Sequence, residues 1–74
     1  MEFKEEHLKE GNILIVQESE PLYSRPFKTR IIEVTKNSIL YSNEDMPGKP
    51  ILRHTIGKFL NCFRLIEWIE GKPK

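Results

Sequence analysis

Aromatic and basic side chains alternate within one short stretch of this chain, and they are the residues best suited to binding chemistry. They are Tyr23, Arg25, Phe27, Lys28 and Arg30. On an extended strand, Lys28 and Arg30 would share a face with their Cβ atoms about 7 Å apart, which is close to the spacing of successive phosphates. Aromatic rings between the cations could stack on bases while the cations neutralise a phosphate backbone. The pattern therefore indicates a candidate binding patch.

The charge distribution supports a basic patch without naming its partner. Residues 1–20 carry six acids against two lysines, a sum of −4, and residues 21–64 carry eight basic side chains against three acids, a sum of +5. The net charge of the chain is only +1. Such asymmetry hints at a basic face, and Arg53, Lys58 and Arg64 could extend the patch. The alternative interpretation is a mixed, solvated surface, with Phe27 in the core and the cations keeping an edge strand soluble.

No constellation of residues predicts catalysis or metal binding, and we expect neither an enzyme nor a cofactor. His7 and His54 are isolated in the sequence; we expect His7 to be exposed and His54 to lie on a strand face. One cysteine cannot complete a zinc site with paired ligands, and Cys62 has apolar neighbours that suggest a small buried hydrophobe. Glu44 and Asp45 lack further oxygen ligands at calcium-loop spacing. The glycines are scattered singly, so no phosphate-binding loop is present.

Length and composition allow one small domain. The chain has 74 residues, of which 38% are apolar and 31% charged, a balance that suits a single modest core. We expect a charged N-terminal arm over residues 1–10, one domain over residues 11–70 and a disordered tail over residues 71–74. The single cysteine cannot form an intramolecular disulfide, which favours a reducing, cytoplasmic setting. We see no leader peptide and no apolar run long enough to span a membrane.

A hairpin over residues 27–43 is the element around which we expect the chain to be organised. Its sequence, FKTRIIEVTKNSILYSN, is rich in β-branched residues, which favour strands. Ile32 and Val34 are two residues apart and are expected to share a face, as are Ile39 and Tyr41 on the return strand. A slip of one residue would exchange the two faces, so the assignment of faces depends on the register.

Turn residues mark the ends of the other elements. The hairpin turn TKNS contains Asn37, a residue that tolerates left-handed backbone angles. Further strands are expected over residues 12–17, over residues 51–55 or 56, and over residues 65–69. The spacing of the apolar residues in IGKFLNCF predicts a single helical or 3₁₀ turn before the last strand. The result is a mainly β, antiparallel protein.

This order of elements resembles the SH3-like barrel over roughly residues 9–70. The resemblance is carried by the lead-in LKEGNILIV, the long loop ESEPLYSRP, the hairpin around Lys36 and Asn37, and the turn IGKFLNCF. It implies a five-stranded antiparallel barrel with a single 3₁₀ or helical turn before the last strand. Peptide-binding members carry paired tyrosines in the first loop and a tryptophan at the start of the third strand, whereas Tyr23 is alone in its loop and Trp68 lies in the last strand. Binding of proline-rich peptides is therefore not implied.

Two functions of different class fit these observations, because a fold alone does not choose between partners. The leading hypothesis is a non-catalytic protein-interaction module, in which an exposed strand edge could pair with a partner chain. By analogy, such a small domain suits a phage or mobile-element accessory protein that acts on a host protein. The alternative is a nucleic-acid-binding barrel that uses Tyr23, Arg25, Lys28, Arg30 and Arg53. A homodimer is compatible with both, and no membrane partner is expected.

Overall fold

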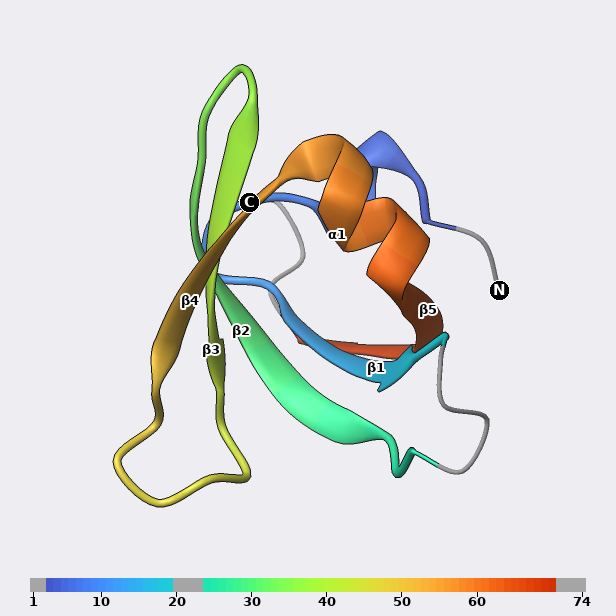
Figure 1. The fold of residues 1–74 in the computed structure, drawn as a ribbon, viewed down its shortest axis with the longest axis vertical. Helices are drawn as coiled ribbons and strands as arrows, with labels where there is room; N and C mark the ends of the chain where they lie inside the picture. Colours follow the sequence, from blue (N-terminus) through green and yellow to red (C-terminus); the bar gives the residue numbers. More distant parts are fainter. Residues whose placement is uncertain (1–2, 20–23, 71–74) are drawn as a thin grey trace.

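Five antiparallel strands form one sheet in the computed structural model, which describes residues 3–19 and 24–70 (Figure 1). The elements in chain order are η1 (Glu5–His7), β1 (Ile13–Glu18), β2 (Phe27–Val34), β3 (Ser38–Asn43), β4 (Ile51–Thr55), α1 (Ile56–Cys62) and β5 (Phe63–Glu70). The strand order is β4-β3-β2-β1-β5, so the last strand pairs with the first. The expected strands are confirmed within two residues of their predicted ends. The sheet is not closed, so a barrel is not confirmed, and β4 and β5 are its edges.

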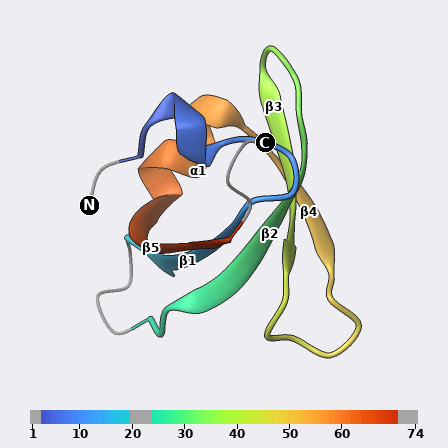
Figure 2. The ribbon, with the colours of Figure 1, turned by 180° about the vertical axis from the view of Figure 1, so that it is seen from behind.

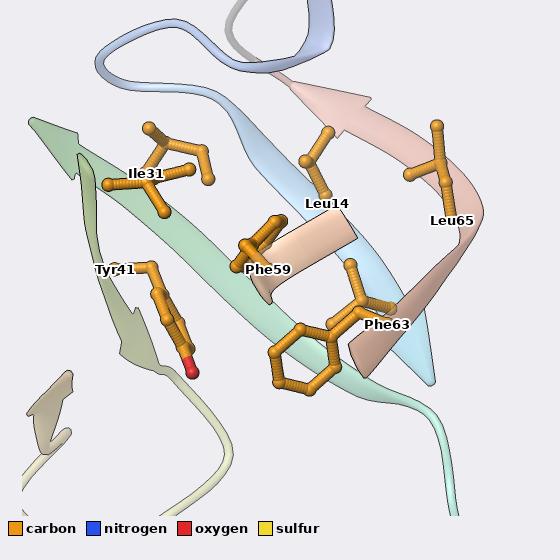
Figure 3. Packing of buried hydrophobic residues seen from close by; sticks show 8 residues of the cluster. Leu14, Ile31, Tyr41, Phe59, Phe63 and Leu65 are labelled. Atoms are coloured by element: carbon orange, nitrogen blue, oxygen red, sulfur yellow. The ribbon is translucent and has the colours of Figure 1, made fainter. Parts of the chain in front are cut away.

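The core lies between the curved sheet and α1, which links the two edge strands (Figures 1 and 2). We call the face of the sheet that packs on this core the inner face, and the opposite face the outer face. Phe59 of α1 is fully buried, and its ring centroid lies 5.1 Å from those of both Tyr41 and Phe63 (Figure 3). The helix has seven residues, more than the single turn predicted. It begins where the Thr55 hydroxyl accepts a hydrogen bond from the backbone N–H of Lys58 (3.1 Å).

The predicted hairpin is confirmed, but one of its predicted faces is wrong. Ile39 and Tyr41 are both buried on the inner face, as expected. Ile32 is exposed instead of sharing a face with Val34, because the β2–β3 register shifts between Ile31 and Glu33. The extra residue is a β-bulge, which leaves one side chain outside the alternation. Ile31 therefore takes the core position, with 1% of its surface exposed.

The hairpin turn is shaped by a threonine side chain. The hydroxyl of Thr35 accepts a hydrogen bond from the backbone N–H of Ser38 (3.0 Å), and the backbone N–H of Thr35 donates to the carbonyl of Ser38 (2.9 Å). Asn37 does not adopt the left-handed angles that the sequence suggested for it. Among the described residues, those with positive φ are Gly11, Gly48 and Lys49. Local side-chain bonds to the backbone therefore define this turn.

Bulges also decide which side chains of β5 reach the core. Val16 pairs with Leu65 and Leu14 pairs with Trp68. The two β1 residues are two positions apart, whereas their inward-facing partners on β5 are three apart, so β5 contains one extra residue. Ile66 lies in that bulge and is exposed, whereas Leu65 is buried. In an unbroken strand, Phe63, Leu65 and Glu67 would face one side and Arg64, Ile66 and Trp68 the other, so both faces would be mixed in polarity. The bulge resolves the ambiguity, because it lets residues from both alternating sets face inward.

The N-terminal arm packs against the core, and the expected exposure of His7 is wrong. The His7 side chain is buried, with its ring 5.1 Å from the Trp68 ring, and its Nδ1 accepts a hydrogen bond from the backbone N–H of Lys4 (2.9 Å). The Phe3 ring lies 5.6 Å from that of Phe59. These contacts join residues distant in sequence, so the arm contributes to the core. The expected tail over residues 71–74 lies outside the described residues.

Candidate functional site

The structure describes four of the five predicted binding residues, and it does not gather these four into one patch. Tyr23 lies outside the described residues. Arg25 is exposed in the segment before β2, Lys28 and Arg30 are exposed on β2, and Arg53 is exposed on β4. Lys28 and Arg30 share the outer face of β2, as predicted. Of the four residues that the structure describes, these two are the pair it brings together.

Arg53 lies on the same outer face but in a different row of the sheet. Arg53 pairs with Leu40 on β3, and Leu40 pairs with Glu33 on β2. Arg30, in contrast, pairs with Ser42. Arg30 and Arg53 are therefore separated by two strands and by a shift along them, about 12 Å at ordinary strand spacings. The β2 residue that lies across the sheet from Arg53, beyond Leu40, is an acid, Glu33.

One acid of the β3–β4 connection, Glu44, neutralises one of the two cations on the outer face of β2. The Glu44 carboxylate accepts a hydrogen bond from Arg30 Nε at 3.2 Å and lies 3.7 Å from Lys49 Nζ. Its other oxygen accepts a hydrogen bond from the Ser42 hydroxyl. The Ser42 bond, together with Arg30 and Lys49, lowers the pKa of Glu44 below its ordinary value of 4.5, against the opposing effect of burial. Arg30 therefore has a carboxylate partner and is not a free phosphate ligand.

The remaining residues of the predicted patch have structural roles or lie elsewhere. Phe27 is half-buried and packs edge-on against Phe63, with ring centroids 5.7 Å apart, so the interpretation of Phe27 as a core residue is confirmed. Arg64 donates to the side-chain oxygen of Gln17 (3.2 Å) on the neighbouring strand. Lys58 is exposed on α1. The basic side chains are thus spread over several elements.

Within the described residues, β4 is an edge strand of the sheet, and one of its two sides has no neighbouring strand (Figure 1). Residues of an antiparallel strand alternate between those whose backbone groups face the neighbour and those that face away. At the two ends of the β3–β4 ladder, Asn43 donates to the carbonyl of Pro50 (3.1 Å) and Ile56 donates to that of Asn37 (3.0 Å). The even-numbered residues of β4 therefore bond to β3, and its odd-numbered residues direct their backbone groups outward.

These outward groups form a regular edge flanked by apolar side chains. The N–H groups of Ile51, Arg53 and Thr55 and the carbonyls of Ile51 and Arg53 point away from β3. The β3–β4 register has no shift, so the spacing of the groups is that of an undisturbed strand. Ile51 is 62% exposed on the outer face and Leu52 is 43% exposed on the inner face. We call this feature, over Ile51–Thr55, the β4 edge.

The opposite edge, β5, is less suited to pairing with another strand. Its ladder with β1 shifts twice, between Ile13 and Leu14 and between Ile15 and Val16. Bulges twist an edge and interrupt its row of backbone groups, a common protection against pairing. An open groove of about 690 Å³ runs beside this strand; it is lined by Phe3, Gln17, Leu60, Phe63, Arg64, Leu65 and Ile66.

Metal ligands, the ionisation of Tyr41 and helix length each bear on the chemistry open to the described part of the chain. No group of three or more His, Cys, Asp or Glu side chains among them could hold a metal ion. Burial raises the pKa of Tyr41 to about 12, and the charges of Cys62 and Glu18 add to the shift, so this phenol stays neutral at physiological pH. No helix in the part of the chain that the structure describes is long and apolar enough to cross a bilayer.

Sequence reasoning missed the β4 edge, although a signal for it exists. The residues from 46 to 66 contain Lys49, Arg53, Lys58 and Arg64 and no acid. That stretch includes the whole of β4. The strand order was needed to see that β4 is an edge, because the sequence alone does not say which strands lie outermost.

Comparisons of the chain with protein-family models, with curated proteins and with solved structures found no match.

Proposed function

We propose that this chain is a non-catalytic protein-interaction module that binds an extended segment of a partner protein as an additional strand beside β4. The observation that carries the proposal is the β4 edge: outward backbone groups at ordinary strand spacing, with exposed Ile51 and Leu52 beside them. Strand addition uses main-chain hydrogen bonds for affinity and alternate side chains for specificity. An unpaired, partly apolar edge is otherwise a liability for aggregation, which favours a use for it.

We also propose that the sheet is an SH3-like barrel with an open seam between β4 and β5. The strand order β4-β3-β2-β1-β5 and the placement of α1 between the edge strands support this assignment. So does the stacking of His54 of β4 on Phe63 of β5, with ring centroids 6.3 Å apart. The single cysteine fits a cytoplasmic setting. By analogy with other small stand-alone domains, we propose that the protein is a phage or mobile-element accessory protein that acts on a host protein.

The proposal is tested by removing one outward N–H group from the β4 edge. Arg53→Pro and Arg53→Ala both remove the charge, but only proline removes the backbone donor. Proline is tolerated on an edge strand where the N–H faces solvent. Peptides are first selected from a displayed library of short random sequences for binding to the intact protein. We expect Arg53→Pro to bind them at least about tenfold more weakly than Arg53→Ala, since it loses a hydrogen bond and adds a steric block.

The fold of each variant has to be checked beside its affinity. Leu52→Pro is the matched control, because the N–H of Leu52 faces β3 and its loss should lower the thermal stability. Arg53→Pro should keep the circular dichroism spectrum of the intact protein. Equal affinity of folded Arg53→Pro and Arg53→Ala for the selected peptides would overturn strand addition at this edge. Failure to select any peptide that binds there would have the same meaning.

One observation favours the nucleic-acid alternative: Lys28 and Arg30 share the outer face of β2. Their positive potential is weakened by Glu44, which pairs with Arg30. If this face binds nucleic acid, Glu44→Gln should strengthen binding, and Arg30→Ala should flatten its salt dependence. Fluorescence anisotropy with labelled DNA and RNA at low and physiological salt measures both effects. No binding at low salt would exclude this alternative.

A further inference from the structure

The β4 edge carries a single cation, Arg53, and no acid. From residue 46 to residue 66 the chain has Lys49, Arg53, Lys58 and Arg64 and no acid. Lys49 lies 3.7 Å from Glu44, so part of its charge is already compensated. Arg53, in the middle of β4, takes part in neither salt bridge of the described residues. Among residues 3–19 and 24–70, this central charge therefore has no carboxylate partner.

The nearest acid in the row of Arg53 is too distant to neutralise it. Glu33 lies two strands away, with Leu40 between the two residues. Two strand spacings are about 9.6 Å, close to the distance over which salt screens exposed charges. A strand added on the free side of β4 would instead lie about 4.8 Å from it. Its side chain opposite Arg53 would be the closest charged group available to this guanidinium.

A second copy of this chain is a poor occupant of the edge. Two antiparallel β4 strands can pair their outward groups in registers centred on Leu52, on Arg53 or on His54. In the register centred on Arg53, the two arginines are directly opposite each other. In the other two they are diagonal neighbours, about 7–8 Å apart. Every register brings the two guanidinium groups together, and charged residues that do so are a known protection against edge-to-edge pairing.

We propose that the occupant of the β4 edge is a short acidic segment of a partner protein, with acidic and apolar side chains in alternation. This inference rests on the proposed function and specifies its partner. An acid opposite Arg53 would lie on the outer face and form a cross-strand ion pair. The neighbouring positions of the segment would lie on the inner face, where 43% exposed Leu52 offers apolar surface. Alternation of acid and apolar residue matches the period of two along a strand.

Synthetic probe peptides test the charge of the occupant. The probes alternate valine with glutamate, with lysine or with serine, and they are titrated into the isotopically labelled protein while backbone amide resonances are followed. We expect the valine–glutamate peptide to shift the amide resonances of Ile51, Arg53 and Thr55 at a lower concentration than the other two peptides. Physiological salt should weaken its binding. Arg53→Glu should weaken that peptide about tenfold and favour the valine–lysine peptide, because the cross-strand pair changes sign.

The outcomes separate this inference from the proposed function. If the valine–glutamate peptide does not bind β4, or binds no better than the serine and lysine peptides, the acidic partner is excluded. Strand addition would survive that result if library-selected peptides still distinguish Arg53→Pro from Arg53→Ala. Concentration-dependent shifts of the same three amides without any peptide, together with a dimer in sedimentation, would overturn the inference in favour of a second copy. Lys58→Glu, on α1, is the control for charge away from the edge.

Discussion

Replacement of Asn12 should detach the N-terminal arm from the sheet. Asn12 is fully buried, and its side-chain Nδ2 donates to the backbone carbonyls of Glu6 (3.0 Å) and His7 (2.7 Å). Its backbone carbonyl accepts a hydrogen bond from Ile31 of β2 (2.9 Å). One amide therefore ties η1 to the start of β1. We expect Asn12→Ala to destabilise the protein chiefly because the carbonyls of Glu6 and His7 lose their hydrogen bonds to the side chain.

The magnitude follows from these two hydrogen bonds. Each is worth about 0.5–1.5 kcal/mol net, so their loss costs about 1–3 kcal/mol. The Oδ1 atom of Asn12 is buried without a hydrogen-bond partner among the described residues, and its removal offsets part of that loss. We expect a net decrease of about 2 kcal/mol. The free energy of unfolding of a 74-residue domain is about 4–11 kcal/mol, so the change is large enough to measure easily.

Urea unfolding followed by Trp68 fluorescence is a suitable assay, because the Trp68 ring lies 5.1 Å from that of His7 in the arm. Circular dichroism of the sheet provides a second probe. Asn61→Ala is the matched control: Asn61 is exposed on α1, and its replacement should change the free energy of unfolding by less than about 0.5 kcal/mol. A loss below about 0.5 kcal/mol for Asn12→Ala would refute the role assigned to this amide.

Asn12→Asp provides a sharper version of the same test. The new carboxylate would face two carbonyl oxygens without a proton to donate, so folding would raise its pKa above the unfolded value of about 3.9. A group whose pKa is raised in the folded state stabilises below the unfolded pKa and loses that contribution as pH rises. Asn12→Asp should therefore be less stable than Asn12→Ala at pH 7 and recover in acid. A variant as stable as Asn12→Ala at pH 7 would contradict this reasoning.

Four further predictions concern glycine conformation and titration. Gly48→Ala should destabilise by about 1 kcal/mol, since Gly48 has a φ of +79°; Gly57→Ala, in α1 with open space around it, should stabilise by about 0.5 kcal/mol, and urea unfolding measures both. Folding lowers the pKa of Glu44 below its ordinary value of 4.5, so the ionised carboxylate stabilises the folded protein at pH values above 4.5. The free energy of unfolding should therefore decrease as the pH drops below 4.5, and Glu44→Gln should make that decrease smaller. The raised pKa of Tyr41, about 12 against 10.0, should make stability fall from pH 10 upward, and Tyr41→Phe should remove that part of the alkaline loss; an unchanged profile would contradict the assignment.

Local patterns in the sequence predicted which segments are strands, because β-branched residues and turn residues act over a few positions. They did not predict the bulges at Ile32 and Ile66, since a bulge depends on the register of the partner strand. The burial of His7 was also missed, because it depends on Trp68, which is distant in sequence. Each of these three errors arose where a contact distant in sequence determined the orientation of a side chain.

The same distinction applies to the candidate site. That Lys28 and Arg30 share a face follows from the period of two along a strand, and the sequence predicted it correctly. That Glu44 neutralises Arg30 could not be predicted, because it depends on the pairing of β2 with β3. The β4 edge depends on the order of all five strands. The acid-free stretch from residue 46 to residue 66 includes this strand, but the sequence does not show that the strand is outermost.

The pairing of β1 with β5 has a consequence for how the chain folds. Residue 13 pairs with residue 70. The side of β1 that does not face β2 is therefore paired only after β5 has been made and has docked. The segment from β2 to β4 is joined by short connections and can form early, because local contacts close small loops. Closing the β1–β5 ladder restricts nearly the whole chain and should be the slow step. Until that step, β1 is a second exposed edge, and a nascent chain without β5 would be prone to aggregation.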